Sequence, residues 1–261
     1  GEEAVDVGGV AREWFLKISK EILNPNYALF KPAANGTTYQ PSPQSSVNPD
    51  HLKYFKFVGR VVGKALQEGY LMDCNFTRPF YQHILNQPLT CQDFALLDPD
   101  YYKNLKWIMD NDVTDLDLTF SYEAEEFGQI IVKDLKEGGR NISVTESNKR
   151  EYLYMLCYAH LADMIKDQIE AFLEGFHEII PPELIQIFNS KELELMITGL
   201  PEINIEDLQK NTEYQNYTSD SEVITWLWDI LENFESCQKA AFLQFVTGTS
   251  KVLCGGFKEL R

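Results

Sequence analysis

The sequence predicts an α+β protein that is mainly helical. Several runs place apolar residues at helical spacing behind recognisable capping residues, and one stretch between them, residues 116–145, alternates apolar and polar residues at both of its ends. With 261 residues, of which 44% are hydrophobic, the chain is also long enough to bury a sizeable core. One large domain or two smaller ones are therefore expected.

The first predicted helix begins near Asn48, which is a plausible N-cap ahead of Pro49 and Asp50. Its apolar positions at helical spacing are Leu52, Phe55, Val58, Val62 and Ala65. Its basic stripe comprises Lys53, Lys56, Arg60 and Lys64. A solvated face is the simpler interpretation of this stripe, and contact with an acidic partner is the alternative.

A second helix is predicted to begin at Pro99, because Asp98 can cap it and proline is favoured in a first turn. The residues that share one face of this helix are Tyr101, Leu105 and Ile108. The alternating stretch 116–145 follows, with a Gly-Gly turn at 138–139. This stretch predicts strands and hairpins.

A long helical pattern begins at Asn148 and ends before Pro181. Its apolar positions are Tyr152, Met155, Leu156, Ala159, Ala162, Ile165, Ile169, Phe172 and Phe176. We expect one long helix here, which would form the spine of the scaffold.

A lobe boundary is predicted after the next short helix, which runs from a Ser190 cap to Gly199 and is followed by Pro201. Two further helical patterns cover residues 221–234 and 237–248. About sixty residues with little strand content can hardly close an independent core. The second lobe therefore looks unfinished.

The charge balance argues against nucleic-acid and membrane partners. Lys and Arg total 23 whereas Asp and Glu total 40, and the net charge of −17 repels phosphate backbones and anionic lipid surfaces. No run reaches the roughly 18 consecutive apolar residues that span a bilayer. A soluble fragment is expected.

The cysteines indicate a reducing compartment, either cytosol or nucleus. Their number is odd, their spacing is irregular and no two of them form a CxxC pair. The five are Cys74, Cys91, Cys157, Cys237 and Cys254. Neither a disulfide framework nor a structural zinc site is indicated by this pattern. Cys157 and His160 share a helix face, but two ligands do not make a metal site, so no metal or cofactor is predicted.

The sequence lacks the motifs of nucleotide-binding proteins and of cysteine proteases. The GTSKV run lacks the GxxxxGK[ST] order that surrounds phosphates. A cysteine protease would need a base beside Cys254, yet the four histidines are distant in sequence and lack a protease context. A glycine-flanked loop cysteine is the simpler interpretation of Cys254.

Eight segments, in this order, resemble the HECT-type ubiquitin ligases: GGVAREWFLKISKEILNPNYALF, HLKYFKFVGRVVGKAL, FTRPFYQHIL, DLTF, AFLEGFHEIIP, ELELMITGLP, NTEY and LQFVTGTSKV. The resemblance runs from Gly8 to the end of the chain. The run GLPxIxIxDLxxNTEY is most similar to the very large members of this family.

The resemblance implies a bilobal catalytic domain. It assigns residues 1–199 to a mainly helical first lobe, with a small α/β subdomain that binds the conjugating enzyme inserted at about 71–149. Residues 200–202 would form the hinge, and residues 203–261 would begin a truncated second lobe.

The activity implied is transfer of ubiquitin from a conjugating enzyme, through a thioester on a cysteine of the ligase, to a substrate lysine. The family nucleophile lies in an HTCFN-like motif that these residues do not contain, so we expect the acceptor cysteine beyond Arg261. Cys254 occupies a variable position of the family. The chain alone is therefore expected to bind the conjugating enzyme without catalysis, while substrate contacts lie in regions not present.

An apolar groove for the conjugating enzyme is implied at Tyr101, Leu105, Ile108, Leu118, Tyr152 and Leu156. Aromatic and aliphatic side chains on one helix face can receive an apolar side chain of a partner, although an ordinary core face is the interpretation from the residues alone. Residues 98–126 hold nine acidic and two basic residues, a local charge of −7 that can steer a basic partner.

Three further sets of residues are implied by the resemblance. These are Tyr39 and Leu161 for a second, non-covalent ubiquitin, Gly199, Leu200 and Pro201 for the hinge, and Glu13 and Asp73 near the lobe interface. A flexible hinge would let the second lobe swing between donor and acceptor. The rival hypothesis is a complete, non-catalytic module that only binds ubiquitin or a conjugating enzyme.

Overall fold

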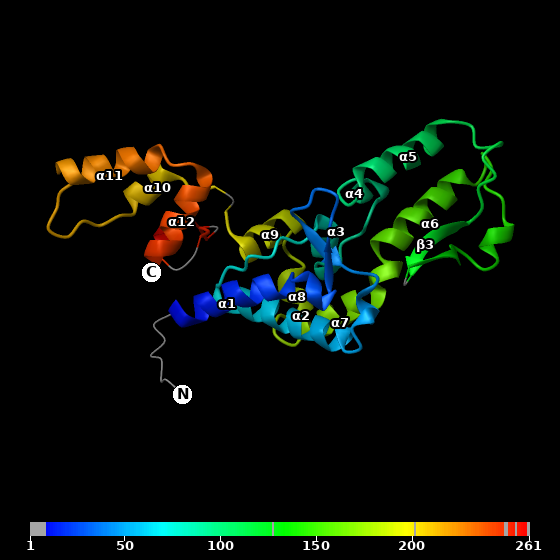
Figure 1. Cartoon of the computed structure of the whole chain (residues 1–261), viewed down its shortest axis with the longest axis horizontal. Coiled ribbons are helices and arrows are strands. Elements are labelled where there is room, and N and C mark those ends of the chain that lie inside the picture. Colours follow the sequence, from blue (N-terminus) through cyan, green and yellow to red (C-terminus); the bar gives the residue numbers. More distant parts are fainter. Residues whose placement is uncertain (1–8, 127, 201, 248–249, 254, 260–261) are drawn as a thin grey trace. The chain divides into compact units, whose positions relative to one another are not determined.

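The computed structural model describes residues 9–126, 128–200, 202–247, 250–253 and 255–259 (Figure 1). The chain divides into two compact units, the first made of segments 1–21, 64–74 and 191–261 and the second of segments 22–63 and 75–190. The described residues are mainly helical, with two small antiparallel sheets in addition. The predicted α+β class is confirmed.

The second unit contains both sheets and most of the helices. Its elements are β1 (Phe30–Pro32), β2 (Tyr39–Pro41), most of α2 (His51–Glu68), α3 (Arg78–Ile84), α4 (Cys91–Phe94), α5 (Pro99–Asp110), β3 (Ser121–Glu126), β4 (Gln129–Asp134), α6 (Lys149–Leu161), α7 (Lys166–His177) and α8 (Pro182–Ile185). β1 pairs with β2, and β3 pairs with β4 from Ser121 opposite Asp134 to Glu126 opposite Gln129.

The contact between α2 and α7 is close enough to require glycine. A Cβ atom at Gly59 would stand 2.0 Å from the carbonyl oxygen of Phe172, and one at Gly175 would stand 1.9 Å from that of Lys56. Beside this contact lies a set of buried, mutually packed aromatic rings: Phe30, Phe55, Phe76, Phe80 and Phe172. Close backbone approach thus lets α7 seat Phe172 against the aromatic core.

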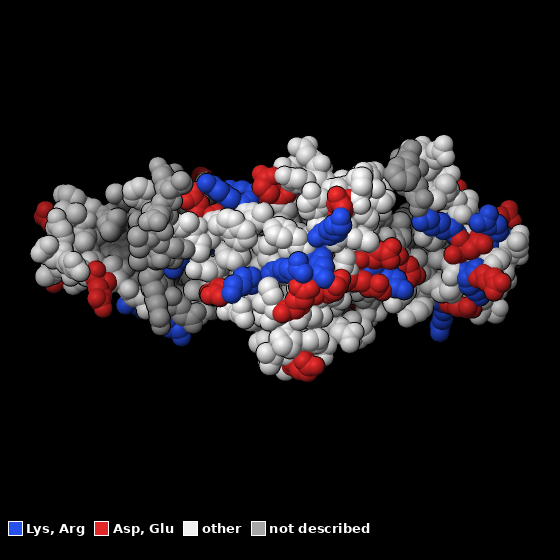
Figure 2. Space-filling view, turned by 90° about the horizontal axis from the view of Figure 1, so that it is seen from below, with Lys and Arg blue, Asp and Glu red and all other residues white. Residues whose placement is uncertain are grey.

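The basic stripe of α2 is paired within the chain. Lys56 contacts Glu174 and Glu178 of the α7 segment, and Arg60 forms a two-pronged ion pair with Glu178, with distances of 2.5 and 3.0 Å. These cations lower the pKa of Glu178 to about 2. Figure 2 shows Lys and Arg interspersed with Asp and Glu on one face of the molecule.

A second core forms where α4 and α5 pack on α6 (Figure 1). We call it the α4–α6 cluster, and its buried members are Phe94, Leu97, Leu105, Val113, Phe120, Val144, Tyr152, Leu153, Leu156, Cys157 and Leu161. The helix starts follow local signals. Asp98 accepts a hydrogen bond from the Tyr101 N–H at 2.9 Å, as predicted, and Thr90 and Asp93 form a capping box on α4.

The expectation of one long helix from Asn148 to the residues before Pro181 is wrong. α6 ends at Leu161, residues 163–165 form a 3-10 turn, and α7 begins at Lys166. The backbone leaves the helical region at Ala162, with φ −134° and ψ −58°. No glycine or proline marks this break, because it arises from packing: Leu161 belongs to the α4–α6 cluster while Phe172 belongs to the aromatic core.

The first unit contains α1 (Gly9–Ile22), the end of α2, α9 (Ser190–Thr198), α10 (Ile205–Lys210), α11 (Glu222–Glu232) and α12 (Ser236–Thr247), with the boundary residues Ile22 and Ser190 in the second unit. The helix predicted at residues 190–199 is confirmed, as are those at 221–234 and 237–248, to within a few residues at their ends. The buried residues of α10 and α11 form a small core of Ile205, Ile224, Trp228 and Leu231. None of the described helices is long and apolar enough to cross a bilayer.

The α2–α7 contact makes a prediction about stability. Gly175→Ala should lower the free energy of unfolding by about 1–3 kcal/mol, because the new methyl group overlaps the Lys56 carbonyl and this outweighs the roughly 1 kcal/mol by which alanine favours a helix. Gly9→Ala is the matched control, since a Cβ atom there meets nothing within 4 Å. Urea unfolding followed by circular dichroism measures both. Equal stability of Gly175→Ala and wild type would contradict the contact.

Candidate functional site

The six predicted groove residues converge on the α4–α6 cluster. Three are buried, with exposed fractions of 5%, 5% and 1%: Leu105, Tyr152 and Leu156. Three are partly buried at its margin: Tyr101, Ile108 and Leu118. Burial raises the pKa of Tyr152 to about 12. The buried three shape the site from beneath, and only the marginal three offer surface to a partner.

Exposed apolar side chains also occur on α5 and in the loop after it, and they were not predicted. On α5 they are Trp107 and Met109, with exposed fractions of 53% and 39%, and Leu116 follows in the next loop at 39%. Exposed apolar residues close together are typical of interaction surfaces. The helical period assigns Trp107 to the solvent side of α5. A large aromatic residue at a position that faces solvent is the sequence signal that could have identified this exposed side chain.

Several acidic residues of segment 98–126 form hydrogen bonds or ion pairs with groups nearby in the sequence. Asp98 caps α5, Asp100 forms an ion pair with Lys103 at 2.8 Å, and Asp112 accepts from the Thr114 hydroxyl at 2.6 Å. The Thr114 contacts lower the pKa of Asp112, so this carboxylate stays charged at neutral pH. A negative field beside the groove margin is therefore maintained.

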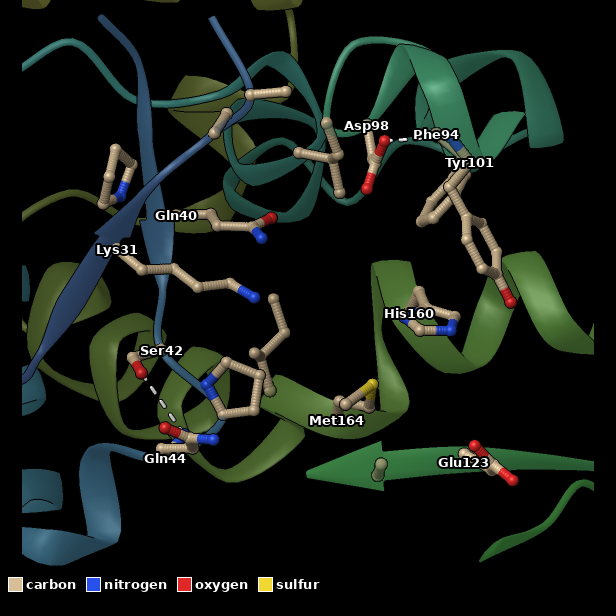
Figure 3. Close-up of a pocket in the computed structure, with 17 residues that line it drawn as sticks. Lys31, Gln40, Ser42, Gln44, Phe94, Asp98, Tyr101, Glu123, His160 and Met164 are labelled. Carbon is tan, nitrogen blue, oxygen red and sulfur yellow. Dashed lines mark hydrogen bonds between the residues drawn. The ribbon is translucent and has the colours of Figure 1, made fainter. Parts of the chain in front are cut away.

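Tyr39 and Leu161 differ in accessibility. Tyr39 lies in β2 and is partly exposed, whereas the Leu161 side chain is buried at 2% and its carbonyl oxygen lies 2.9 Å from Nε2 of His83. Their sequence neighbours Gln40 and His160 line one cavity of about 590 Å³, shown in Figure 3. Tyr39 and Leu161 themselves do not line this cavity, and Leu161 instead lines a separate small hollow together with Cys91 and Tyr158.

The cavity combines an apolar floor with a lysine. Phe94, Leu97 and Ile165 are buried in its wall, and the Lys31 ammonium points toward its centre (Figure 3). Within the part of the chain that the structure describes, Lys31 makes no hydrogen bond or ion pair; burial among the walls lowers its pKa and the nearby Asp98 carboxylate opposes this. An acceptor group on a ligand or partner side chain would fit beside it.

His160 lies in the wall of this cavity as a packed aromatic group. Its ring centroid stands 5.4 to 5.5 Å from those of Phe94, Tyr101 and Tyr122. Burial lowers the pKa of His160, so the imidazole is neutral near pH 7. Among the described residues there is no group of three or more His, Cys, Asp or Glu side chains that could hold a metal ion.

The predicted hinge begins at a backbone position that favours glycine. Gly199 has φ +78°, and a Cβ there would stand 2.6 Å from the carbonyl oxygen of Val252, which also accepts the Leu200 N–H at 2.7 Å. Pro201 lies outside the described residues. Segments on both sides of residues 199–202 belong to the first unit. Hinge motion stays a prediction.

The two predicted interface acids are both ion-paired inside the first unit. Glu13 forms a pair with Lys17, one turn along α1, at 2.7 Å, and Asp73 forms one with Lys251 at 3.1 Å. The Glu13 pair is exposed and contributes little to stability. Asp73 connects segments far apart in the sequence, so its role in this structure is to hold the 250–253 segment.

The described cysteines offer no nucleophile with a catalytic base. Cys74, Cys91, Cys157 and Cys237 are free thiols. Burial raises the pKa of Cys74 to about 12, which leaves it unreactive at neutral pH. Cys254 lies outside the described residues.

The burial pattern predicts that alanine substitutions at Leu156 and Trp107 differ in their effect on the free energy of unfolding. Leu156→Ala should lower the free energy of unfolding by about 2–5 kcal/mol, because it empties a fully buried site. Trp107→Ala should change it by no more than about 0.5 kcal/mol, since that side chain is exposed. Chemical unfolding of both variants measures these changes. An equally small change in the free energy of unfolding for both variants would place Leu156 at the surface.

Comparisons with known proteins identify the family of this chain. The profile of the family described as HECT-domain (ubiquitin-transferase) matches residues 16–261. The E3 ubiquitin-protein ligase TOM1-like of Neurospora crassa is 52% identical over 262 residues, which is all of this chain and 6% of that protein. UPL1 of Arabidopsis thaliana is 52% identical over 269 residues, which is all of this chain and 7% of that protein.

A third relative, the E3 ubiquitin-protein ligase HACE1 of Gallus gallus, is 50% identical over 263 residues, again all of this chain and 28% of that protein. The chain thus spans less than a third of each of these relatives. The resemblance read from the eight sequence segments is confirmed. The chain belongs to the HECT-domain family of E3 ubiquitin-protein ligases.

Proposed function

We propose that this chain is the part of a HECT ubiquitin ligase that receives the ubiquitin-charged conjugating enzyme. The observation that carries the proposal is the family match over residues 16–261 together with the convergence of the six groove residues on one cluster. In the parent protein, ubiquitin passes to a cysteine of the ligase as a thioester and from there to a substrate lysine. The parent is thus a transferase.

The chemistry of this transfer consists of two acyl transfers. A cysteine thiolate of the ligase attacks the carbonyl carbon of the ubiquitin thioester, and the conjugating enzyme leaves as its own thiolate. A substrate amine then attacks the new thioester, which releases the ligase thiol and forms an amide bond. The first step needs a cysteine positioned at the ubiquitin thioester with a general base to take up its proton, and none of the described cysteines has such a base beside it.

The docking surface we propose is the margin of the α4–α6 cluster. Tyr101, Ile108 and Leu118 supply a partly buried apolar surface, and the exposed Trp107 precedes Ile108 in α5. Such residues provide the desolvated anchors that dominate protein interfaces. Carboxylates nearby would steer a basic surface of the conjugating enzyme and raise its association rate.

The remaining family assignments belong to the same proposal. Two lobes meet at a hinge of residues 200–202, and the small subdomain at about 71–149 carries the docking surface. A non-covalent ubiquitin would contact Tyr39, which is partly exposed, whereas the Leu161 side chain is buried and would act from beneath the surface. The free thiols fit a protein of the cytosol or nucleus.

Docking is tested at the margin. Ile108→Asp should weaken binding of a cognate conjugating enzyme at least about tenfold, because it places a charge in a desolvated apolar contact. Ile187→Asp is the matched control, since Ile187 is 76% exposed and lies outside the α4–α6 cluster. Affinities are measured by calorimetry against a panel of conjugating enzymes.

Thermal melts accompany these titrations, because Ile108 is partly buried. Trp107→Asp serves as the second docking variant, as its exposed side chain carries little packing energy. Unchanged affinity in variants that retain the wild-type melting temperature would remove the docking surface from the α5 margin.

Catalysis is tested by thioester formation. With activating enzyme, conjugating enzyme and ubiquitin present, the 261-residue chain should form no reductant-sensitive ubiquitin adduct at any of its five cysteines. Non-reducing electrophoresis detects such an adduct. A band that disappears in Cys254→Ala would make Cys254 an acceptor and overturn this part of the proposal.

A further inference from the structure

Two cysteines far apart in the sequence meet at the edge of the α4–α6 cluster. Cys91 is the first residue of α4, and its Sγ lies 3.9 Å from the carbonyl oxygen of Leu153 on α6. Cys157 stands one helical turn after Leu153, and its side chain lies beside that of Cys91 in the lining of one small hollow. Both line the same small hollow together with Tyr154 and Tyr158.

The two thiols have unequal environments. Cys91 is partly exposed, whereas Cys157 is buried with an exposed fraction of 3%. The hydrogen bond from Cys157 lowers the pKa of Cys91 to about 7, and contact with Cys91, together with burial, raises the pKa of Cys157. The accessible sulfur is therefore the more acidic of the two, and the enclosed one keeps its proton at neutral pH.

This asymmetry is the arrangement of an oxidant-reactive cysteine beside a resolving cysteine. We propose that Cys91 is a peroxide-reactive modification site and that Cys157 resolves it as an intramolecular disulfide between α4 and α6. The inference goes beyond ubiquitin transfer and does not depend on it.

The steps balance with a hydroperoxide as the oxidant. The Cys91 thiolate attacks one peroxide oxygen, the O–O bond breaks, and the product is a sulfenic acid with water as the other product after protonation. Cys157 then attacks the sulfenic sulfur, loses its proton and releases a second water molecule as the S–S bond forms. Over both steps each of the two sulfur atoms loses one electron, and the peroxide gains these two electrons.

The other described cysteines do not share this arrangement. Cys74 is fully buried and keeps its proton, because burial raises its pKa. Cys237 is exposed, and its Sγ lies 3.8 Å from the carboxylate of Glu235. A carboxylate cannot form a disulfide, so this contact gives Cys237 no resolving partner. Cys237 therefore serves as the internal control for simple exposure.

The modification would fasten α4 to the helix that carries Tyr152 and Leu156. A disulfide between residues 91 and 157 closes a long loop that contains α5 and the β3–β4 hairpin. Cross-links over long loops restrict the unfolded chain and stabilise the fold when their geometry is not distorted. Reduction by cellular thiols would reverse it, as expected of a transient disulfide in a reducing compartment.

The first experiment uses the unmodified chain. After full reduction, alkylation with iodoacetamide is followed at each cysteine by peptide mass spectrometry between pH 5.5 and 9. Cys91 should react with a midpoint near pH 7, about 1.5 units below a model thiol of pKa about 8.5. A midpoint at or above that of the model thiol would overturn the proposal without any substitution.

The second experiment adds hydrogen peroxide at pH 7 and maps the products. Wild type should yield a peptide pair joined through Cys91 and Cys157, whereas Cys157→Ser should accumulate a dimedone adduct at Cys91. Cys237→Ser, the control, should give the same joined pair in the same yield as wild type. Dimedone labelling of Cys237 in preference to Cys91, or absence of the joined pair in folded wild type, would overturn the assignment.

Discussion

The backbone contact between α2 and α7 is the constraint on which the second unit depends. With glycine at 59 and 175, each helix lies against main-chain atoms of the other, and no side chain separates them. That proximity seats Phe172 among the buried aromatic rings and brings the carboxylates of Glu174 and Glu178 within reach of the α2 cations. The direction of α7 is thereby fixed, and the preceding segment must arrive from a defined side.

The break at Ala162 follows from this fixed direction. α6 has to place Tyr152 and Leu156 beneath α5, whereas α7 has to meet α2, and one straight helix cannot satisfy both cores. The chain therefore turns through a 3-10 segment between them. The same turn brings Ile165 into the wall of the cavity, so the hollow in Figure 3 results from joining two cores with different helix directions.

Local signals predicted the start of α5, whereas α2 begins at His51 and not at Pro49, and long-range contacts were beyond the sequence. Asp98 and Pro99 identify the beginning of α5, and the Thr90 and Asp93 capping box could have identified α4 in the same way. Apolar periodicity could not separate Leu105 from Ile108, because core and groove margin require the same residue types. The family resemblance selected the groove residues, but only packing shows which are buried. The meeting of Cys91 with Cys157 carries no local signature at all.

The turn at Ala162 also bears on how the molecule opens. Hydrogen exchange reports the free energy of each opening, and a hydrogen-bonded ladder that is interrupted divides a fold into units that open separately. The amide protons of α6 are expected to exchange with solvent when the α4–α6 cluster opens, and those of α7 when its contact with α2 opens. The α4–α6 cluster and the α2–α7 pair can therefore open separately, each with its own free energy of opening.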